Sequence, residues 1–329
     1  MSKPVFIPLS SIQLTPKPNY PAILVLGFRP FYLLAAAWMV IALPLWMLAW
    51  GHGFFTHSHL LGMFWHAHEI IFGFTSAVIV GFLFTAVRNW SGHPTPHGYH
   101  LALIAATWIA ARIMLLSQYS EIGAIFDVSF FALSASGLAI PLWRSGNKRN
   151  YFFVVLLSLL GVLSALHHLA ALDFVWLSER GVLHTSLGII AIIITVMAGR
   201  VIPMFTTNAV PAAPVNRGVL LDSTAVISTI ASIIAVIFLP EAMTSVVLIL
   251  AAGIHLYRWI NWAPLHTLKH PLLWILHFSY LWLPIAMLLL SIPITWLPMK
   301  EMLAIHAFTT GTICGLCLGM MSRTARGHT

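Results

Sequence analysis

The chain has 329 residues, of which 60% are hydrophobic and only 7% carry a formal charge. Because soluble domains contain roughly 25% charged residues, this composition excludes a water-soluble globule and requires an apolar solvent, the lipid bilayer. The formal net charge is +8, but the 16 Lys and Arg residues are scattered and form no basic run, which argues against a nucleic-acid partner.

Ten apolar runs of about 20 residues are each long enough to cross the hydrocarbon core as an α-helix. Turn-forming residues separate these runs, and no soluble domain fits between them. We therefore predict an all-α, polytopic transmembrane helix bundle: a cytoplasmic tail of residues 1–29 and one transmembrane domain of residues 30–329. The predicted helices span residues 30–50, 60–87, 99–117, 121–143, 151–172, 182–205, 220–239, 241–262, 272–292 and 300–323.

The basic residues predict the orientation of the bundle. Loops on the cytoplasmic side of a membrane protein carry an excess of Lys and Arg. An N-terminus in the cytoplasm places most of the 16 basic residues at inner helix ends or inner loops. With ten helices, both ends of the chain then lie inside.

Histidine is the most frequent ionisable residue, with 17 copies. In the predicted orientation, histidines of four helices share one layer near the outer surface. They are His66, His68, His167, His168, His184 and His306. Ionisable groups at this depth are costly unless they find partners inside the bundle, which makes them functional candidates. Imidazole is the commonest ligand of iron, copper and zinc, so we predict that these histidines hold a metal or haem; hydrogen bonding between helices is the alternative for any single one.

Helical geometry limits which histidines share a centre. His66 and His68 differ by about 200° around their helix, so they should serve different centres or partners. We predict that one of them pairs with His306 and the other with His184, as axial haem ligands from facing helices. Glu69 is the predicted acceptor that orients a ligand histidine.

Other polar residues near this layer allow two interpretations each. Arg112 and Asp127 lie at similar depths on adjacent helices, which predicts an ion pair; Arg112 can instead bind a haem propionate. The loop histidines His52, His57 and His59 are placed to guide a metal inward, although loop histidines are usually just solvated.

His66, His184 and His306 each open an inward-running helix that has an Arg near its inner end. Their similar spacing suggests an internal repeat, with the second, sixth and tenth helices at the centre of the bundle. This arrangement resembles the catalytic subunit of haem-copper oxidases, in which twelve helices form three arcs. The resemblance is one of architecture and does not by itself carry function.

A closer resemblance extends along essentially the whole chain. The segments that carry it are Gly27-Phe-Arg-Pro-Phe31, Trp65-His-Ala-His-Glu69, Phe72-Gly-Phe74, the stretch from Gly81 to Gly92, Gly199-Arg-Val-Ile-Pro-Met-Phe205 and Arg323-Thr-Ala-Arg-Gly-His-Thr329. In these segments the chain resembles the NnrS family of bacterial membrane proteins. The Trp-His-Ala-His-Glu block is the most specific of them.

The resemblance implies an inner-membrane protein that contains haem and copper and acts in nitric oxide metabolism or nitrosative-stress resistance. It also implies a twelve-helix arrangement, of which this chain would be a truncated, ten-helix version. Nitric oxide partitions into bilayers and binds haem iron, so a haem in the outer leaflet would meet it there, to bind it, sense it or turn it over. The competing hypothesis is a proton- or metal-coupled transporter that uses the same histidines.

Overall fold

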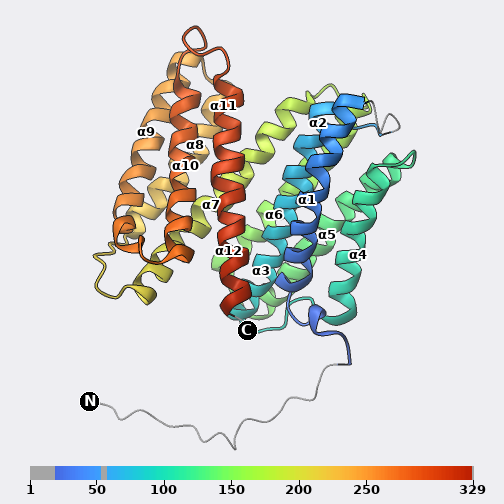
Figure 1. The fold of residues 1–329 in the computed structure, drawn as a ribbon, viewed down its shortest axis with the longest axis horizontal. Helices are drawn as coiled ribbons and strands as arrows, with labels where there is room; N and C mark the ends of the chain where they lie inside the picture. Colours follow the sequence, from blue (N-terminus) through green and yellow to red (C-terminus); the bar gives the residue numbers. More distant parts are fainter. Residues whose placement is uncertain (1–18, 53–57, 328–329) are drawn as a thin grey trace, which may run out of the picture.

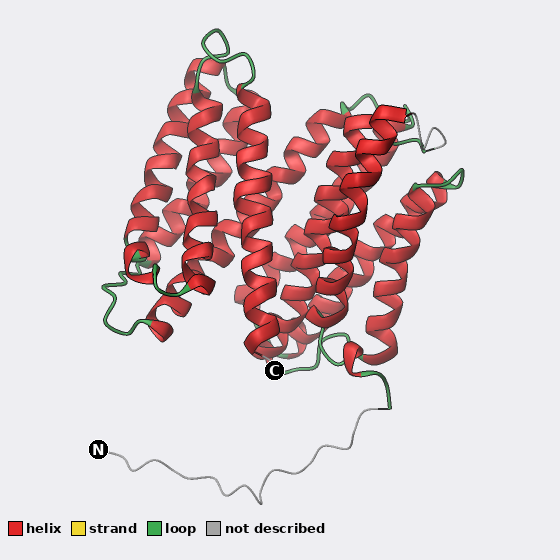
Figure 2. Cartoon of the chain, in the orientation of Figure 1, coloured by secondary structure: helices red, strands yellow, loops and turns green. Residues whose placement is uncertain are grey.

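The structure, a computed structural model, describes residues 19–52 and 58–327. In this part of the chain ten helices are long and apolar enough to cross a membrane, and no strand is present (Figure 2). Each predicted helix overlaps one of them, so the polytopic α-helical bundle is confirmed. The elements are η2 (Ala22–Leu24), α1 (Phe28–His52), α2 (Gly62–His68), η3 (Glu69–Thr75), α3 (Ser76–Ser91), α4 (Gly98–Leu115), α5 (Ser120–Arg144), η4 (Lys148–Asn150), α6 (Tyr151–Ala171), α7 (Glu179–Ala209), α8 (Val219–Phe238), α9 (Glu241–Ile260), η5 (Pro264–Thr267), α10 (Pro271–Ser291), α11 (Lys300–His306), η6 (Ala307–Cys314) and α12 (Gly315–Gly327).

Two of the membrane-crossing helices change their winding part-way. The second consists of α2, the π-helical segment η3 and α3 without a break, and the tenth consists of α11, the π-helical segment η6 and α12. Each π-helical segment directly follows a histidine of the outer layer, His68 or His306. Such segments are rare and often occur at functional sites. The hydropathy pattern, which predicted two regular α-helices, contains no signal for them.

The helices form two groups joined by α7 (Figure 1). On one side α4, α5 and α6 pack in chain order beside α1 and α3; on the other, α8, α9 and α10 pack in order beside α11 and α12. Residues of α3, α7 and α12 line a common small cavity of about 100 Å³. Tyr32 of α1 and Leu276 of α10 line this cavity as well, so the central position of the second, sixth and tenth helices stays a prediction.

α1 begins and α12 ends at the same end of the bundle (Figure 1). We call the opposite end, where α1 ends and α2 begins, the outer end, following the predicted orientation. Large apolar side chains are exposed on the bundle surface, for example Val40, Ile227 and Phe238, whereas the interior holds aromatic and small residues. An exposed apolar surface is stable only in an apolar solvent, as a membrane provides.

Candidate metal centre

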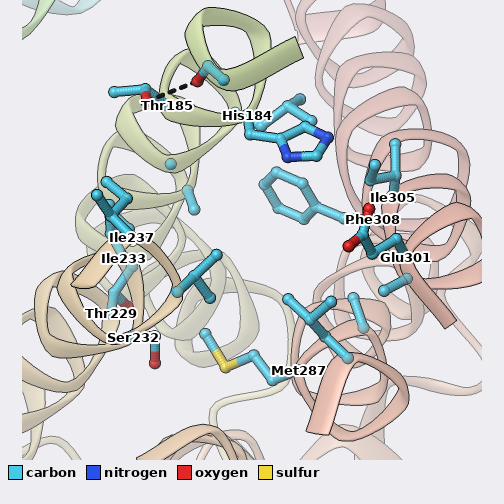
Figure 3. Close-up of a pocket in the computed structure, with 18 of the residues that line it drawn as sticks. His184, Thr185, Thr229, Ser232, Ile233, Ile237, Met287, Glu301, Ile305 and Phe308 are labelled. Atoms are coloured by element: carbon cyan, nitrogen blue, oxygen red, sulfur yellow. Dashed lines mark hydrogen bonds between the residues drawn. The ribbon is translucent and has the colours of Figure 1, made fainter. Parts of the chain in front are cut away.

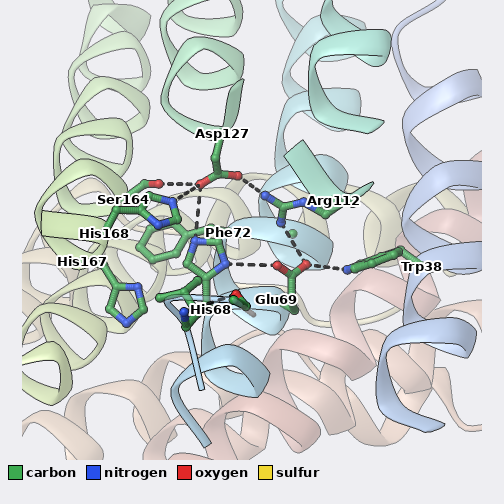
Figure 4. A network of polar contacts seen from close by, with 12 residues as sticks. Trp38, His68, Glu69, Phe72, Arg112, Asp127, Ser164, His167 and His168 are labelled. Atoms are coloured by element: carbon green, nitrogen blue, oxygen red, sulfur yellow. Dashed lines mark hydrogen bonds and ion pairs between the residues drawn. The ribbon is translucent and has the colours of Figure 1, made fainter. Parts of the chain in front are cut away.

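A cluster of polar side chains lies inside the outer half of the bundle, between α2, η3, α4, α5 and α6 (Figure 4). Its five central members are at most 3% exposed: His68, Glu69, Arg112, Asp127 and His168. Buried polar groups must be satisfied by one another, because no water or lipid headgroup reaches them. The arrangement of their atoms therefore shows which groups are satisfied and which are not.

Arg112 joins the two carboxylates of the cluster. Its guanidinium lies 3.0 Å from Oε2 of Glu69 and also contacts Oδ1 of Asp127. The predicted ion pair with Asp127 is confirmed, and Glu69 joins it. Trp38 donates a hydrogen bond of 2.7 Å to the same oxygen of Glu69. One cation thus faces two anions, so with neutral imidazoles the cluster retains one negative charge.

Two imidazoles point at the remaining oxygen of Asp127. Nε2 of His68 lies 3.4 Å and Nε2 of His168 lies 3.5 Å from Oδ2. Neither nitrogen has a hydrogen-bond partner among the described residues, although both are buried. One ligand atom from each of the three residues lies within 4.8 Å of the others. Two imidazole nitrogens and a carboxylate oxygen around one point are a donor set typical of a divalent transition-metal ion.

Neighbouring groups hold these donors in place. Nδ1 of His68 lies 3.2 Å from Oε1 of Glu69, which fixes the ring and leaves Nε2 free. Ser164 donates a hydrogen bond of 2.5 Å to Oδ2 of Asp127. Partners of this kind set the tautomer and orientation of metal ligands. The role predicted for Glu69, as an acceptor for a ligand histidine, matches its contact with His68.

Two further histidines border the cluster. The ring of His167 stacks on that of His68 with centroids 5.3 Å apart, and both its nitrogens are buried without a hydrogen-bond partner among the described residues. Nε2 of His59 lies 2.9 Å from Nδ1 of His168, and its Nδ1 lies 2.9 Å from Oγ of Ser120. Burial, and next the neighbouring His168 and His68, lower the pKa of His59 to about 4. The alternative of a solvated loop histidine is wrong for His59, whereas His57 lies outside the described residues.

A glycine of the π-helical segment makes room for the ion pair. A Cβ atom on Gly73 would lie 2.7 Å from Nη1 of Arg112 and 2.8 Å from Oε2 of Glu69, closer than real Cβ contacts. The carbonyl oxygen of Gly73 also accepts a hydrogen bond of 3.1 Å from Nε1 of Trp108. Gly73 of the Phe72-Gly-Phe74 segment thus has no side chain, and this leaves the space that Arg112 and Glu69 occupy.

The structure does not bring His68 to His184 or His306. His66 points away from the cluster, as its angle to His68 predicted, and stacks on Trp46 with centroids 4.3 Å apart. No hydrogen bond or ring contact among the described residues joins His66 to His306. Nδ1 of His306 contacts the main-chain oxygen of Met302 at 2.8 Å, which leaves Nε2 available.

His184 lies at a cavity of about 560 Å³ between α6, α7, α8, α10 and α11. The walls are mostly apolar, and Figure 3 shows the His184 ring beside Phe308, with Met287 on another side of the space. His184 makes no hydrogen bond to a described side chain; its charged neighbours are Arg180 and Glu301. The predicted histidine layer is therefore divided: His68, His167 and His168 belong to the polar cluster, His184 lines the cavity, and His66 and His306 belong to neither.

A second polar network lies in the inner half, among α7, α8, α9 and α10. Arg258 contacts Oδ1 of Asp222 at 2.6 Å and donates to the hydroxyl of Tyr280, which lies 2.6 Å from Nδ1 of His255. A Cβ atom on Gly199 would collide with the guanidinium of Arg258. No hydrogen bond among the described residues links this network to the polar cluster around His68.

Comparison with known protein families assigns residues 22–329 to the family described as NnrS protein. The chain belongs to the NnrS family. No curated protein and no solved structure matches the chain. Within this NnrS protein, the segments that carried the resemblance contribute to both polar networks. Trp65–Glu69 supplies His68 and Glu69 of the outer cluster, and Phe72–Phe74 supplies Gly73 beside it. Gly199–Phe205 supplies Gly199, which lies against Arg258 of the inner network. Asp127, which completes the donor set, lies outside these segments.

Proposed function

We propose that this NnrS-family protein is a metal-containing protein of the bacterial inner membrane that acts in nitric oxide metabolism or nitrosative-stress resistance, with both ends in the cytoplasm. The observation that carries the proposal is the convergence of Nε2 of His68, Nε2 of His168 and Oδ2 of Asp127 inside the bundle, with both imidazole nitrogens lacking a hydrogen-bond partner. Leaving such groups unsatisfied in the interior costs about 1–3 kcal/mol each, which a bound cation would offset.

The chemistry of the donors supports copper at this cluster. Imidazole and carboxylate ligands suit Cu(II) better than Cu(I), which prefers the soft sulfur ligands Cys and Met. The excess negative charge left by Glu69, Asp127 and Arg112 also favours a cation there. His68, Asp127 and His168 would hold the ion, and Glu69 would keep the ring of His68 in its ligating orientation.

We propose the cavity at His184, and not the cluster, as the place of a haem. The cluster residues are packed against one another and against Phe72 and Trp38, which leaves no room for a porphyrin. The cavity of about 560 Å³ falls within the roughly 300–1,000 Å³ of ligand pockets and has apolar walls. We propose that His184 holds the haem iron and that Arg180, one residue before Gly181 of the lining, pairs with a propionate at the outer rim.

The two proposed centres flank one helix. Leu163 and Leu166 of α6 line the cavity, whereas Ser164, His167 and His168 of the same helix face the polar cluster. Nitric oxide is small and nearly apolar, so it would reach the cavity from the lipid through apolar walls. A bound haem would supply an iron that takes nitric oxide as a ligand. The protein's own part would be to hold that iron away from water, on the other side of α6 from the second metal ion.

The absorption spectrum and metal content of the purified full-length protein test this proposal. We expect one copper ion that is lost in His68→Ala and His168→Ala, and a haem absorption band that is lost in His184→Ala. His100→Ala is the matched control, because His100 is an exposed histidine at the start of α4. A wild-type protein that binds neither copper nor haem after both are supplied would refute the proposal.

The transporter hypothesis makes a different prediction for the same histidines. Transport requires polar groups along a path through the whole membrane. The outer cluster and the inner network of His255 and Arg258 are not joined by a hydrogen bond among the described residues. Copper flux into proteoliposomes that contain the protein, abolished by His68→Ala, would favour the transporter over a resident metal centre.

A further inference from the structure

Four imidazoles form an unbroken file from the outer loop into the metal cluster. Ring centroids are 5.1 Å apart between His59 and His168, 4.8 Å between His168 and His68, and 5.3 Å between His68 and His167. His59 is the only partly exposed member of this file; the other three are buried. The file therefore connects a surface position with the donors of the proposed centre.

Residues 58–60 lie beside the cluster, where His59 contacts His168. Ser58 and Leu60 are 5% and 1% exposed, so His59 is the point at which this short segment reaches the surface. Ser120, at the start of α5, fixes the segment by accepting a hydrogen bond from the main-chain N–H of His59 and by contacting its Nδ1. His168, Asp127 and His68 lie behind it and are at most 3% exposed. His59 is thus the member of this file that an ion from the outer side can reach directly.

We propose that His59 is the uptake ligand of the metal centre: it binds a divalent transition-metal ion at the outer surface and passes it to His168. The inference rests on the proposed metal centre. Nε2 of His59 and Nδ1 of His168 are 2.9 Å apart, so no apolar protein separates the two rings. For the transfer, the ring of His59 turns outward and breaks this hydrogen bond to bind the ion, and the ring of His168 turns so that its Nε2, the nitrogen beside Asp127, receives the ion. The transfer exchanges one imidazole ligand for another and involves no oxidation or reduction.

The same hydrogen bond defines the state after transfer. When Nε2 of His168 binds the ion beside Asp127, its Nδ1 carries the proton and donates it to Nε2 of His59. Nδ1 of His59 then donates to Oγ of Ser120. In that state both nitrogens of His59 are engaged in hydrogen bonds, so His59 is not a ligand of the stored ion. The rate of uptake and the final metal content should therefore respond differently to its removal.

The test is the time course of Cu(II) uptake by metal-free, full-length protein in detergent, followed by the absorption of the bound ion. His59→Ala removes the ring, and His59→Phe keeps a ring of similar size over the cluster without its nitrogens. We expect both variants to reach the wild-type copper content, but about tenfold more slowly. His100→Ala, which removes an exposed histidine elsewhere, should load at the wild-type rate.

Several results would overturn the inference. Uptake by His59→Ala at the wild-type rate or faster would make His59 a cover and not an uptake ligand. A lower final copper content in both variants, with an unchanged initial rate, would make it a ligand of the stored ion. Wild-type protein that takes up no copper would instead refute the metal centre itself, and failure to fold would be recognised by the circular dichroism of each variant.

Discussion

Nε2 of His68 and Oδ2 of Asp127 lie 3.4 Å apart at the centre of a buried polar cluster, although the two residues belong to different helices. Ser164 already donates to this oxygen, and Nε2 of His168 approaches it as well. A carboxylate oxygen surrounded in this way is the common point of the donor set.

Asp127→Asn should abolish copper binding, because the substitution keeps the shape of the side chain but removes its charge and replaces one oxygen by a donor group. Arg112 retains Glu69 as a partner, so the protein should still fold. The measurement is the copper content after dialysis. Asp173→Asn, in an exposed turn, is the control and should leave the copper content unchanged. Full copper content in Asp127→Asn would exclude Asp127 as a ligand.

Glu69→Gln should weaken copper binding without abolishing it. Glu69 contacts Nδ1 of His68, and removing such an orienting partner costs about 10–100-fold in metal affinity. A competition titration with a chelator measures the effect. An affinity equal to that of the wild type would show that the contact does not orient the ligand, whereas a complete loss of binding would point to Glu69 as a ligand in its own right.

Arg112→Met should destabilise the protein strongly. The guanidinium is buried between two carboxylates, and removing one partner of a buried ion pair costs about 3–5 kcal/mol because the other charge stays buried. Thermal unfolding in detergent measures the loss. Arg144→Met is the matched control, because Arg144 is an exposed Arg at the end of α5 and its removal should leave the stability almost unchanged. Equal effects of the two substitutions would contradict the prediction.

Gly73→Ala should disturb the cluster although it adds only one methyl group. That methyl group would lie 2.7 Å from Nη1 of Arg112, so the ion pair with Glu69 must shift. We expect about 1–3 kcal/mol of destabilisation and a reduced copper affinity. Gly253→Ala on α9 is the control, because nothing lies within 4 Å of the added atom. A Gly73→Ala protein as stable as the Gly253→Ala protein would show that the space is not needed.

Ala304→Phe should separate the two proposed centres. Ala304 is buried and lines the cavity at His184, so a phenyl ring there fills space that a porphyrin would need. We expect the haem band to disappear while the copper content stays at the wild-type level. Leu303→Phe, at an exposed neighbouring position of α11, should keep both. If Ala304→Phe retains its haem band, the haem lies elsewhere.

Much of the fold follows from local properties of the sequence. Ten apolar runs predicted the ten helices, because the length and hydropathy of a segment decide whether it can cross a bilayer, independently of its neighbours. The Arg112 and Asp127 pair was also predictable, because each residue lies at a similar depth on one of two consecutive helices and such helices usually pack side by side.

The site was predictable only in part. Depth along each helix placed His68, Glu69 and His168 correctly in one layer. A common depth does not determine which histidines are in contact. The predicted pairing of His68 with His184 or His306 does not occur. No pattern in the sequence indicated that Asp127 is a donor shared by two histidines, or that His59 lies beside His168.

Local hydropathy and a rise of about 1.5 Å per residue were enough to predict a polytopic helix bundle, the ten membrane-spanning helices of the described residues and the relative depth of their ionisable side chains. Which of these side chains share a site depends on the packing of the helices against one another. Helical-wheel angles predict a facing direction only in a regular helix, and the π-helical segment that starts at Glu69 changes the angle of every residue after it. Contacts such as that between His59 and His168 depend further on how helices distant in the chain pack together, which no local pattern encodes.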